Sequence, residues 1–285
     1  PASQSGIKLQ TLPVTGAPRP YVSALMAAEV GAVGPLPLAI APHESLMLTV
    51  QFGRGSQPIE QKGAHGENTV LTGIRRWTGS FTAAGDCTSL FALLTPLGSV
   101  QLLESQPLDK VPLIRARVAE LLDRSVIRSL ESNIALATTI EDKLRAFAAW
   151  LEARAIANRC LTRAALRAGR AAMRVCDAPS TAIESLADEQ HVSRRQLERD
   201  FGQWLGTSPR HLAQVARVQA VSRKAQAGGS SLADIAADVG FADQAHMSRV
   251  VRQLTGLTPQ RFIRSRQSVM AGAFRSATGG RTVYL

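Results

Sequence analysis

The chain has 285 residues, of which 45% are hydrophobic, and it carries 33 Lys and Arg against 22 Asp and Glu, a formal net charge of +11. This length predicts two domains, and the apolar content is sufficient for packed cores. No run of about 18 apolar residues and no signal peptide are present, which argues against a membrane span, and we expect a cytoplasmic protein.

The positive charge is unevenly distributed along the chain. Residues 1–110 contain seven basic and seven acidic residues, residues 111–176 contain twelve and six, and residues 177–285 contain fourteen and nine. The excess is therefore confined to the later part of the chain, as expected for a polyanionic partner.

Residues 1–110 are predicted to be mostly β-structure. Pro13–Pro42 is rich in Gly and Pro, and we assign no strand to it. Four later segments are apolar or alternating and are separated by turn residues: Ser45–Phe52, Thr69–Ile74, Thr78–Thr82 and Thr88–Leu94. Several short strands without intervening helices favour a small barrel or sandwich.

The β-rich region has few candidates for a metal site, which would need three or four His or carboxylate ligands. The candidates are too sparse for a motif, and we interpret them as surface residues: His43, Glu44, His65 and Glu67. We therefore expect no metal and no cofactor.

Aromatic residues of the same region could instead line a pocket for a small ligand. The four candidates are Phe52, Trp77, Phe81 and Phe91. Core packing is the commoner role of such residues. The sequence does not identify the ligand that such a pocket would bind.

Residues 107–176 are predicted to be helical. Pro112–Arg128 has apolar residues on one side, and Thr138-x-x-Glu141 is a capping box before a second helix. Its apolar positions are Leu144, Phe147, Leu151 and Ile156. Arg163–Arg174 is a further helix, and we interpret its arginines, Arg167 among them, as a solvated face. The apolar faces pack either on the β-region or on a second copy of the chain.

The segment Ile183–Phe262 contains two helix–turn–helix-like units in tandem. The first runs from Ile183 to Pro209 and the second from Ser231 to Pro259. Each has a short apolar helix, a tight turn, a second helix and a Gly-x-Ser/Thr-Pro stop. This is the order of a helix–turn–helix, whose second helix enters the DNA major groove. A helix over Pro209–Ala227 joins the units.

Capping residues support these boundaries. Thr181 and Ser193 open capping boxes in the first unit, and Ser231 opens one in the second. Asp243 is placed to cap the second recognition helix.

The recognition helices are predicted to have one apolar face and one polar face. The inward residues are Leu197 and Phe201 in the first, and Met247, Val250, Val251 and Leu254 in the second. A solvated basic face on an ordinary bundle is the alternative, and the internal agreement of two units disfavours it.

Ile183–Phe262 resembles the DNA-binding domain of the AraC/XylS family of bacterial transcription regulators. The resemblance is carried by Leu186-Ala187, Ser193, Leu197, Arg199, Phe201, Gly206-x-Ser208-Pro209, Ile235-Ala236, Val239-Gly240-Phe241, Ser248-Arg249, Gly256 and Thr258–Phe262. His191 stands where the family has a turn glycine, Met247 and Val251 replace phenylalanines, and Ile263 replaces an arginine.

The resemblance implies double-stranded DNA as a partner and contacts from both recognition helices. The implied DNA-binding residues are Ser193, Arg194, Arg195, Glu198, Arg199, Asp243, Gln244, Ala245, His246, Arg249 and Arg252. Base contacts are expected from Arg195, Arg199, Gln244 and Arg249, because arginine can hold guanine and glutamine can pair with adenine. The helix N-termini at Ser193 and Asp243, with Arg252, are expected at phosphates.

A looser resemblance links Arg75–Thr78 and Phe91–Pro96 to the cupin-like sensor domain of some AraC/XylS regulators. The expected fold is therefore α+β, with an N-terminal cupin-like β-barrel, a helical extension and an all-α double helix–turn–helix domain. The expected parts are a sensor at 1–110, a helical dimerisation or linker region at 111–178, a DNA-binding domain at 179–265 and a flexible tail at 266–285.

The resemblance further implies an activator that contacts RNA polymerase and is controlled by a small-molecule effector or by homodimer formation. The alternative is an enzyme: a cupin-type metal enzyme or a cysteine alkyl-transfer repair protein. Cys87, Cys160 and Cys176 lie far apart without zinc spacing or a disulfide pattern, and Cys87 fits a buried strand position better than a reactive one.

Overall fold

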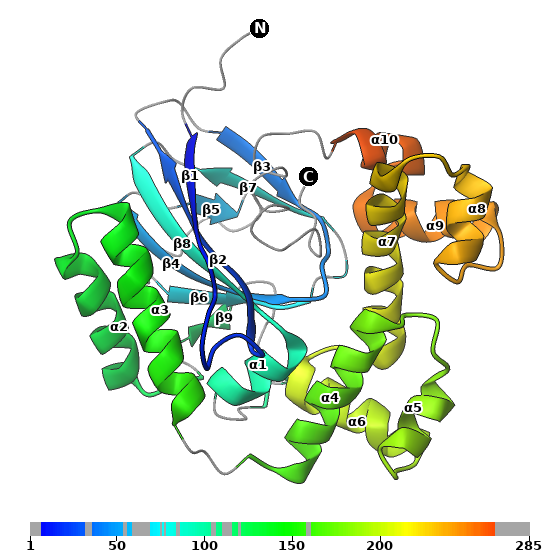
Figure 1. Ribbon diagram of the computed structural model, residues 1–285, viewed down its shortest axis with the longest axis horizontal. Helices are drawn as coiled ribbons and strands as arrows, with labels where there is room; N and C mark the ends of the chain where they lie inside the picture. The colour runs from blue at the N-terminus through cyan, green and yellow to red at the C-terminus, as the bar shows by residue number, and fades with distance from the viewer. Residues whose placement is uncertain are drawn as a thin grey trace, which may run out of the picture.

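The computed structural model shows a β-region beside a column of helices (Figure 1). It describes residues 7–31, 36–53, 56–58, 69–74, 76, 78–83, 86–103, 107–109, 116–118, 121–157 and 161–265.

The N-terminal region contains two antiparallel sheets. The larger has the order β1 (Ile7–Leu12), β2 (Val22–Val30), β8 (Cys87–Leu94), β4 (Leu46–Gly53), β6 (Thr69–Thr72) and β9 (Ala116–Arg117), and the smaller has the order β3 (Leu36–Ile40), β7 (Gly79–Ala83) and β5 (Ser56–Pro58). Among the described strands these sheets do not close on each other. The mixed α+β class with an N-terminal sheet is confirmed, whereas the barrel is not.

The four predicted strands are present as β4, β6, β7 and β8. The sequence prediction missed β2, although this strand lies inside the larger sheet, between β1 and β8. Its sequence VSALMAAEV is apolar on both faces, and Ala24, Met26 and Ala27 are fully buried. A strand covered on both sides shows no alternation, so periodicity could not identify it.

Four helices follow the sheet: α1 (Pro96–Leu102), α2 (Arg124–Leu136), α3 (Ile140–Ile156) and α4 (Arg163–Asp177). The predicted helix over Pro112–Arg128 is wrong, because β9 occupies residues 116–117 and α2 begins only at Arg124. Val118, Leu121 and Leu122 are nevertheless buried in the core. Their apolar spacing therefore indicated buried side chains but not a helical backbone.

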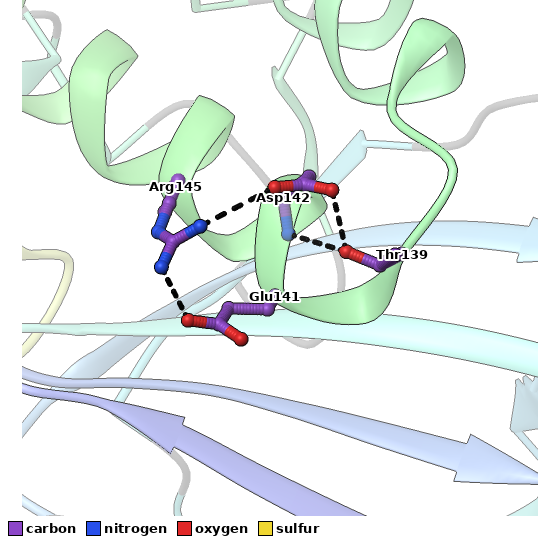
Figure 2. Close-up of polar contacts among 4 residues, drawn as sticks. All are labelled: Thr139, Glu141, Asp142 and Arg145. Atoms are coloured by element: carbon purple, nitrogen blue, oxygen red, sulfur yellow. Dashed lines mark hydrogen bonds and ion pairs between the residues drawn. The ribbon is translucent and has the colours of Figure 1, made fainter.

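The start of α3 lies one residue later than predicted. Thr139, not Thr138, is the cap: its Oγ1 accepts from the Asp142 backbone N–H and donates to the Asp142 carboxylate (Figure 2). Arg145 then pairs with Glu141 and Asp142 on the exposed face (Figure 2). The sequence contains two overlapping Thr-x-x-acid pairs, Thr138 with Glu141 and Thr139 with Asp142, and the second pair forms the cap.

Between residues 183 and 265 the described chain forms helices joined by turns, as predicted. It consists of α5 (Ile183–Glu189), α6 (Arg194–Leu205), α7 (Pro209–Ala227), α8 (Leu232–Asp238), α9 (Gln244–Thr255) and α10 (Pro259–Ser265). In Figure 1, α7 runs between the α5–α6 unit at its lower end and the α8–α9 unit at its upper end. The linking helix was predicted with these bounds.

A continuous apolar core joins the β-region to the helices through α1 and α4. Gly169 of α4 lies against Leu97 of α1, where an added Cβ would be 3.0 Å from Leu97 Cδ1 and 3.2 Å from its Cα. Since α4 also packs on α6 and α7, it connects the β-region to the first helix–turn–helix unit. No helix in the described part of the chain is long and apolar enough to cross a membrane.

Candidate nucleic-acid interface

The first helix–turn–helix unit is α5 and α6 with a tight turn between them. His191, which stands where the family has a glycine, adopts the left-handed conformation (φ 55°) in this turn. Ser193 caps α6 by accepting from the Gln196 backbone N–H at 3.2 Å, and Gly206 ends the helix at φ 62°. The predicted cap at Thr181 is wrong, because α5 begins at Ile183 without a side-chain cap.

The second unit, α8 and α9, repeats this plan with different residues. Ser231 and Asp234 form the predicted reciprocal capping box at the start of α8. Gly240 occupies the left-handed turn position at φ 80°. Asp243 caps α9 by accepting from the His246 backbone N–H at 2.6 Å, and Gly256 ends the helix.

The inward faces of both recognition helices agree with the sequence prediction. Leu197 and Phe201 of α6 are fully buried, and the four predicted apolar residues of α9 are at most 5% exposed. The polar faces therefore point outward, with these exposed: Ser193, Arg194, Arg195, Arg199, Asp243, Gln244, Ala245, Arg249 and Arg252. Glu198 and His246 are half-buried.

Arg194 is held by two carboxylates in the first unit. Its Nη1 lies 2.7 Å from Glu184 Oε1, and its Nε lies 2.9 Å from Glu198 Oε1. Hydrogen bonds with Glu198 and Glu184 raise the pKa of Arg194. The pKa of Glu184 is lowered by its own backbone N–H and by Arg194.

Arg199 is connected to the interior of the domain through a chain of polar side chains. It donates to Gln196 Oε1 at 3.3 Å, and Gln196 donates to Asp200 Oδ1 at 2.7 Å. Asp200 is 1% exposed and pairs with Arg167 of α4, whose Nη2 is 2.6 Å from Asp200 Oδ2. The prediction of a solvated face is therefore wrong for Arg167. Buried Asp200 carried no signal in the sequence.

The second recognition helix holds its polar side chains differently. The His246 ring packs edge-to-face on Phe241, with centroids 5.4 Å apart, and Arg217 lies over the same ring at 5.9 Å. Burial lowers the pKa of Arg217. The side chains of Arg249 and Arg252, like that of Arg195 in the first unit, make no hydrogen bond or ion pair within the described part of the chain.

The β-region contacts both units directly, which the sequence did not predict. The Thr78 backbone N–H donates to the Leu254 carbonyl at the end of α9 at 3.0 Å, and its hydroxyl donates to Leu254 and Thr255. The Leu108 N–H donates to the Gln203 carbonyl of α6 at 2.7 Å. Both recognition helices are thus bonded to the N-terminal region.

The segment before β4 contacts α7. Gln219 donates to the Pro42 carbonyl, and Arg223 lies 3.3 Å from Glu44. His43 and Glu44 are 2% and 8% exposed, so their prediction as surface residues is wrong; His65 and Glu67 lie outside the described residues. No group of three or more His, Cys, Asp or Glu placed to hold a metal occurs among the residues that the structure describes.

A cavity of about 240 Å³ lies where the β-region meets α4 and α7. It is lined by Ser23, Glu44, Ser45, Thr95, Pro96, Met173, Cys176, Asp177 and Arg223. The aromatic residues proposed for a ligand pocket are not among these: Phe52 and Phe91 pack against the apolar clusters of the sheets. The Trp77 and Phe81 side chains lie outside the described part.

Cys87 occupies a structural position at the start of β8. It is 2% exposed, and burial together with Asp86 raises the pKa of its thiol. Because the thiolate is the nucleophilic form, this environment does not suit alkyl transfer. Cys176 is half-buried, and Cys160 lies outside the described residues.

Residues 186–265 match the family model described as "Helix-turn-helix domain". These residues are an AraC-type helix–turn–helix domain. A helix–turn–helix domain of this type supports a DNA-binding transcription regulator. No curated protein matches the chain.

Several solved structures are similar to the chain. The C-terminal domain of AraT, a response regulator from Geobacillus stearothermophilus, is 24% identical over 38% of this chain and 91% of its own length, with a TM-score of 0.34. ToxT from Vibrio cholerae is 10% identical over 93% of this chain and 100% of its own, with a TM-score of 0.46. A DNA-binding transcriptional dual regulator from Escherichia coli K-12 is 21% identical over 36% and 94%, with a TM-score of 0.32.

Proposed function

We propose that α6 and α9 enter successive major grooves on one face of the duplex. The supporting observation is that two recognition helices with the same capping plan are joined by one helix, α7. Its 19 residues span roughly 28 Å at about 1.5 Å per residue, close to the roughly 34 Å between successive major grooves on one face.

In this arrangement four exposed side chains read bases: Arg195, Arg199, Gln244 and Arg249. Arginine can form two hydrogen bonds with guanine, and glutamine can do so with adenine. Ala245, exposed on the first turn of α9, is suited to a thymine methyl group. Glu198 and His246 contribute by holding Arg194 and the Phe241 ring in place.

Phosphate contacts come from the starts of the recognition helices and from nearby arginines. Ser193 and Asp243 mark helix N-termini, where backbone N–H groups face outward. Arg194 and Arg252 add positive charge beside them. These contacts fix the register of the protein on DNA without reading sequence.

The N-terminal region controls DNA binding through a small ligand or through dimerisation. Its contacts with both units, from Thr78 to α9 and from Leu108 to α6, support this proposal. The 240 Å³ cavity between the β-region and α7 is a candidate effector site, because a ligand there would touch Arg223 of α7 as well as Ser45 of the β-region. Exposed Leu136 and Ile156, at the ends of α2 and α3, are candidates for a homodimer contact.

We assign residues 1–110 to the sensor, 111–178 to the linking region and 179–265 to the DNA-binding domain, with activation through RNA polymerase as the outcome. Within the linking region, α4 packs on both neighbours. The tail at 266–285 lies outside the described residues.

The deciding experiment is binding of the full chain to DNA upstream of its own gene and to random DNA, over a salt series. We expect a preference for the upstream DNA that persists as salt rises. Equal binding with steep salt dependence on both DNAs would show that only charge acts and would contradict sequence reading at that site.

A further inference from the structure

We propose that Gln196, Asp200 and Arg167 are positioning residues that hold the Arg199 guanidinium ready to read a base. This inference rests on the proposed base contact by Arg199. It adds three side chains that the resemblance does not assign to DNA binding, one of them on a helix outside the helix–turn–helix unit.

The contacts run without a break from the interior to the outward face of α6. Arg167 Nε and Nη2 lie 2.7 and 2.6 Å from Asp200 Oδ2. The other carboxylate oxygen, Oδ1, accepts from Gln196 Nε2 at 2.7 Å. Gln196 Oε1 then accepts from Arg199 Nη1 at 3.3 Å.

The chemistry of this chain fixes which way the Gln196 amide faces. An ion-paired carboxylate only accepts hydrogen bonds, so Asp200 requires the NH₂ group of Gln196 on its side. The amide oxygen is therefore turned to the opposite side, toward Arg199. A guanidinium only donates, so this orientation holds Arg199, whereas the flipped amide would present N–H groups to it.

Helix geometry and packing make the chain rigid. Gln196 precedes Asp200 by four residues and Arg199 by three, the spacings at which side chains on one helix meet. Asp200 is held from a second helix, because Arg167 belongs to α4 and its side chain is only 20% exposed. The same turn of α4 is anchored to α1, since Gly169, two residues after Arg167, packs against Leu97.

Holding a long side chain in its binding geometry reduces the entropy lost when it binds. Arg195, one turn before Arg199, makes no such contact within the described part of the chain. The structure therefore distinguishes one preorganised arginine from one unrestrained arginine on the same recognition helix.

The test is a base-preference profile, obtained by selecting the full chain on a double-stranded DNA library with a randomised core. Arg199→Ala identifies the position that Arg199 reads as the one whose preference disappears. Gln196→Met keeps the length of the side chain and removes both polar atoms. We expect it to lower the preference at that same position by about 2- to 10-fold, the range for ordering one side chain, and to have no effect there in the Arg199→Ala background.

Gln203→Met, an equivalent change on the same helix, is the matched control and should leave the profile unchanged. A Gln196→Met loss that persists in the Arg199→Ala background, or that is spread over all positions, would overturn the positioning role and indicate a direct or general effect. If Arg199→Ala changes no position, the base contact itself is wrong, and the positioning role fails with it.

Asp200→Asn tests the interior end of the chain. The asparagine oxygen can still accept from Arg167, while its NH₂ group can now donate to Gln196 and favour the flipped amide. We expect a loss of preference at the Arg199 position, together with a lower Tm because the largely buried Arg167 loses its carboxylate partner. An unchanged profile in a folded Asp200→Asn protein would contradict the requirement for an accepting carboxylate.

Discussion

The two helix–turn–helix units share one backbone plan but support their arginines differently. In the first, Arg194 and Arg199 are bonded to neighbouring side chains, and the network reaches Arg167 on α4. In the second, Arg249 and Arg252 have no such partners within the described residues, while the end of α9 is bonded to Thr78 of the β-region. The same motif can thus present either restrained or unrestrained arginines to DNA, depending on the side chains that surround them.

This difference predicts a division of labour. Restrained arginines favour one geometry and hence one base sequence, whereas unrestrained arginines adapt at an entropic cost. We therefore expect sharper base preferences from the first unit than from the second.

The largest effects should come from the two cores and should be similar. Phe201→Ala in the first unit and Met247→Ala in the second each remove a fully buried side chain and should destabilise the domain by about 2–5 kcal/mol. Denaturant unfolding followed by circular dichroism measures this loss. A cost below about 1 kcal/mol for only one of them would show that this unit's core is loosely packed.

The next effect separates base reading from charge. Arg199→Ala should cost about 1–3 kcal/mol on the preferred site and relax preference at one base pair. Titration of specific and random DNA by fluorescence anisotropy measures both affinities. An equal loss on random DNA would identify Arg199 as a phosphate contact instead.

The helix caps should make comparable contributions in both units. Ser193→Ala and Asp243→Ala each remove the side-chain acceptor at the start of a recognition helix. Each should reduce stability by about 0.5–2 kcal/mol, seen as a lower Tm. Ser185→Ala, at an exposed position within α5, is the control and should leave Tm nearly unchanged. An unaltered Tm in either cap variant would refute the contribution of that cap.

The smallest effect compares a free arginine with a paired one. Arg252→Gln should reduce the slope of log K against log salt by about 1, the value for one phosphate contact. Arg194→Gln should reduce it by less, since Glu184 and Glu198 already compensate this charge. Equal changes for both variants would mean that the carboxylates release Arg194 on binding DNA.

Many features of the C-terminal helices were predicted from short sequence patterns alone. Ser193, Ser231 and Asp243 were predicted as caps, and the apolar spacing of α6 and α9 predicted which of their faces are buried. Turns, caps and helix faces depend on residues within a few positions of one another, so they can be predicted from the sequence without knowledge of the tertiary structure. The resemblance to a known domain rests on these same positions.

Tertiary structure decided what depends on residues far apart in the chain. Strand β2 shows no alternation because both its faces are covered. The cap of α3 is Thr139 rather than Thr138, although both residues begin a Thr-x-x-acid pair. Three contacts join segments that are 33 to 179 residues apart in the chain. They are the ion pair of Arg167 with Asp200, the contact of buried Glu44 with Arg223, and the hydrogen bond of Thr78 to the end of α9. From sequence alone, a charged or polar residue is predicted to be exposed to solvent. Its burial becomes favourable only when the fold brings a hydrogen-bonding or charged partner from another element next to it.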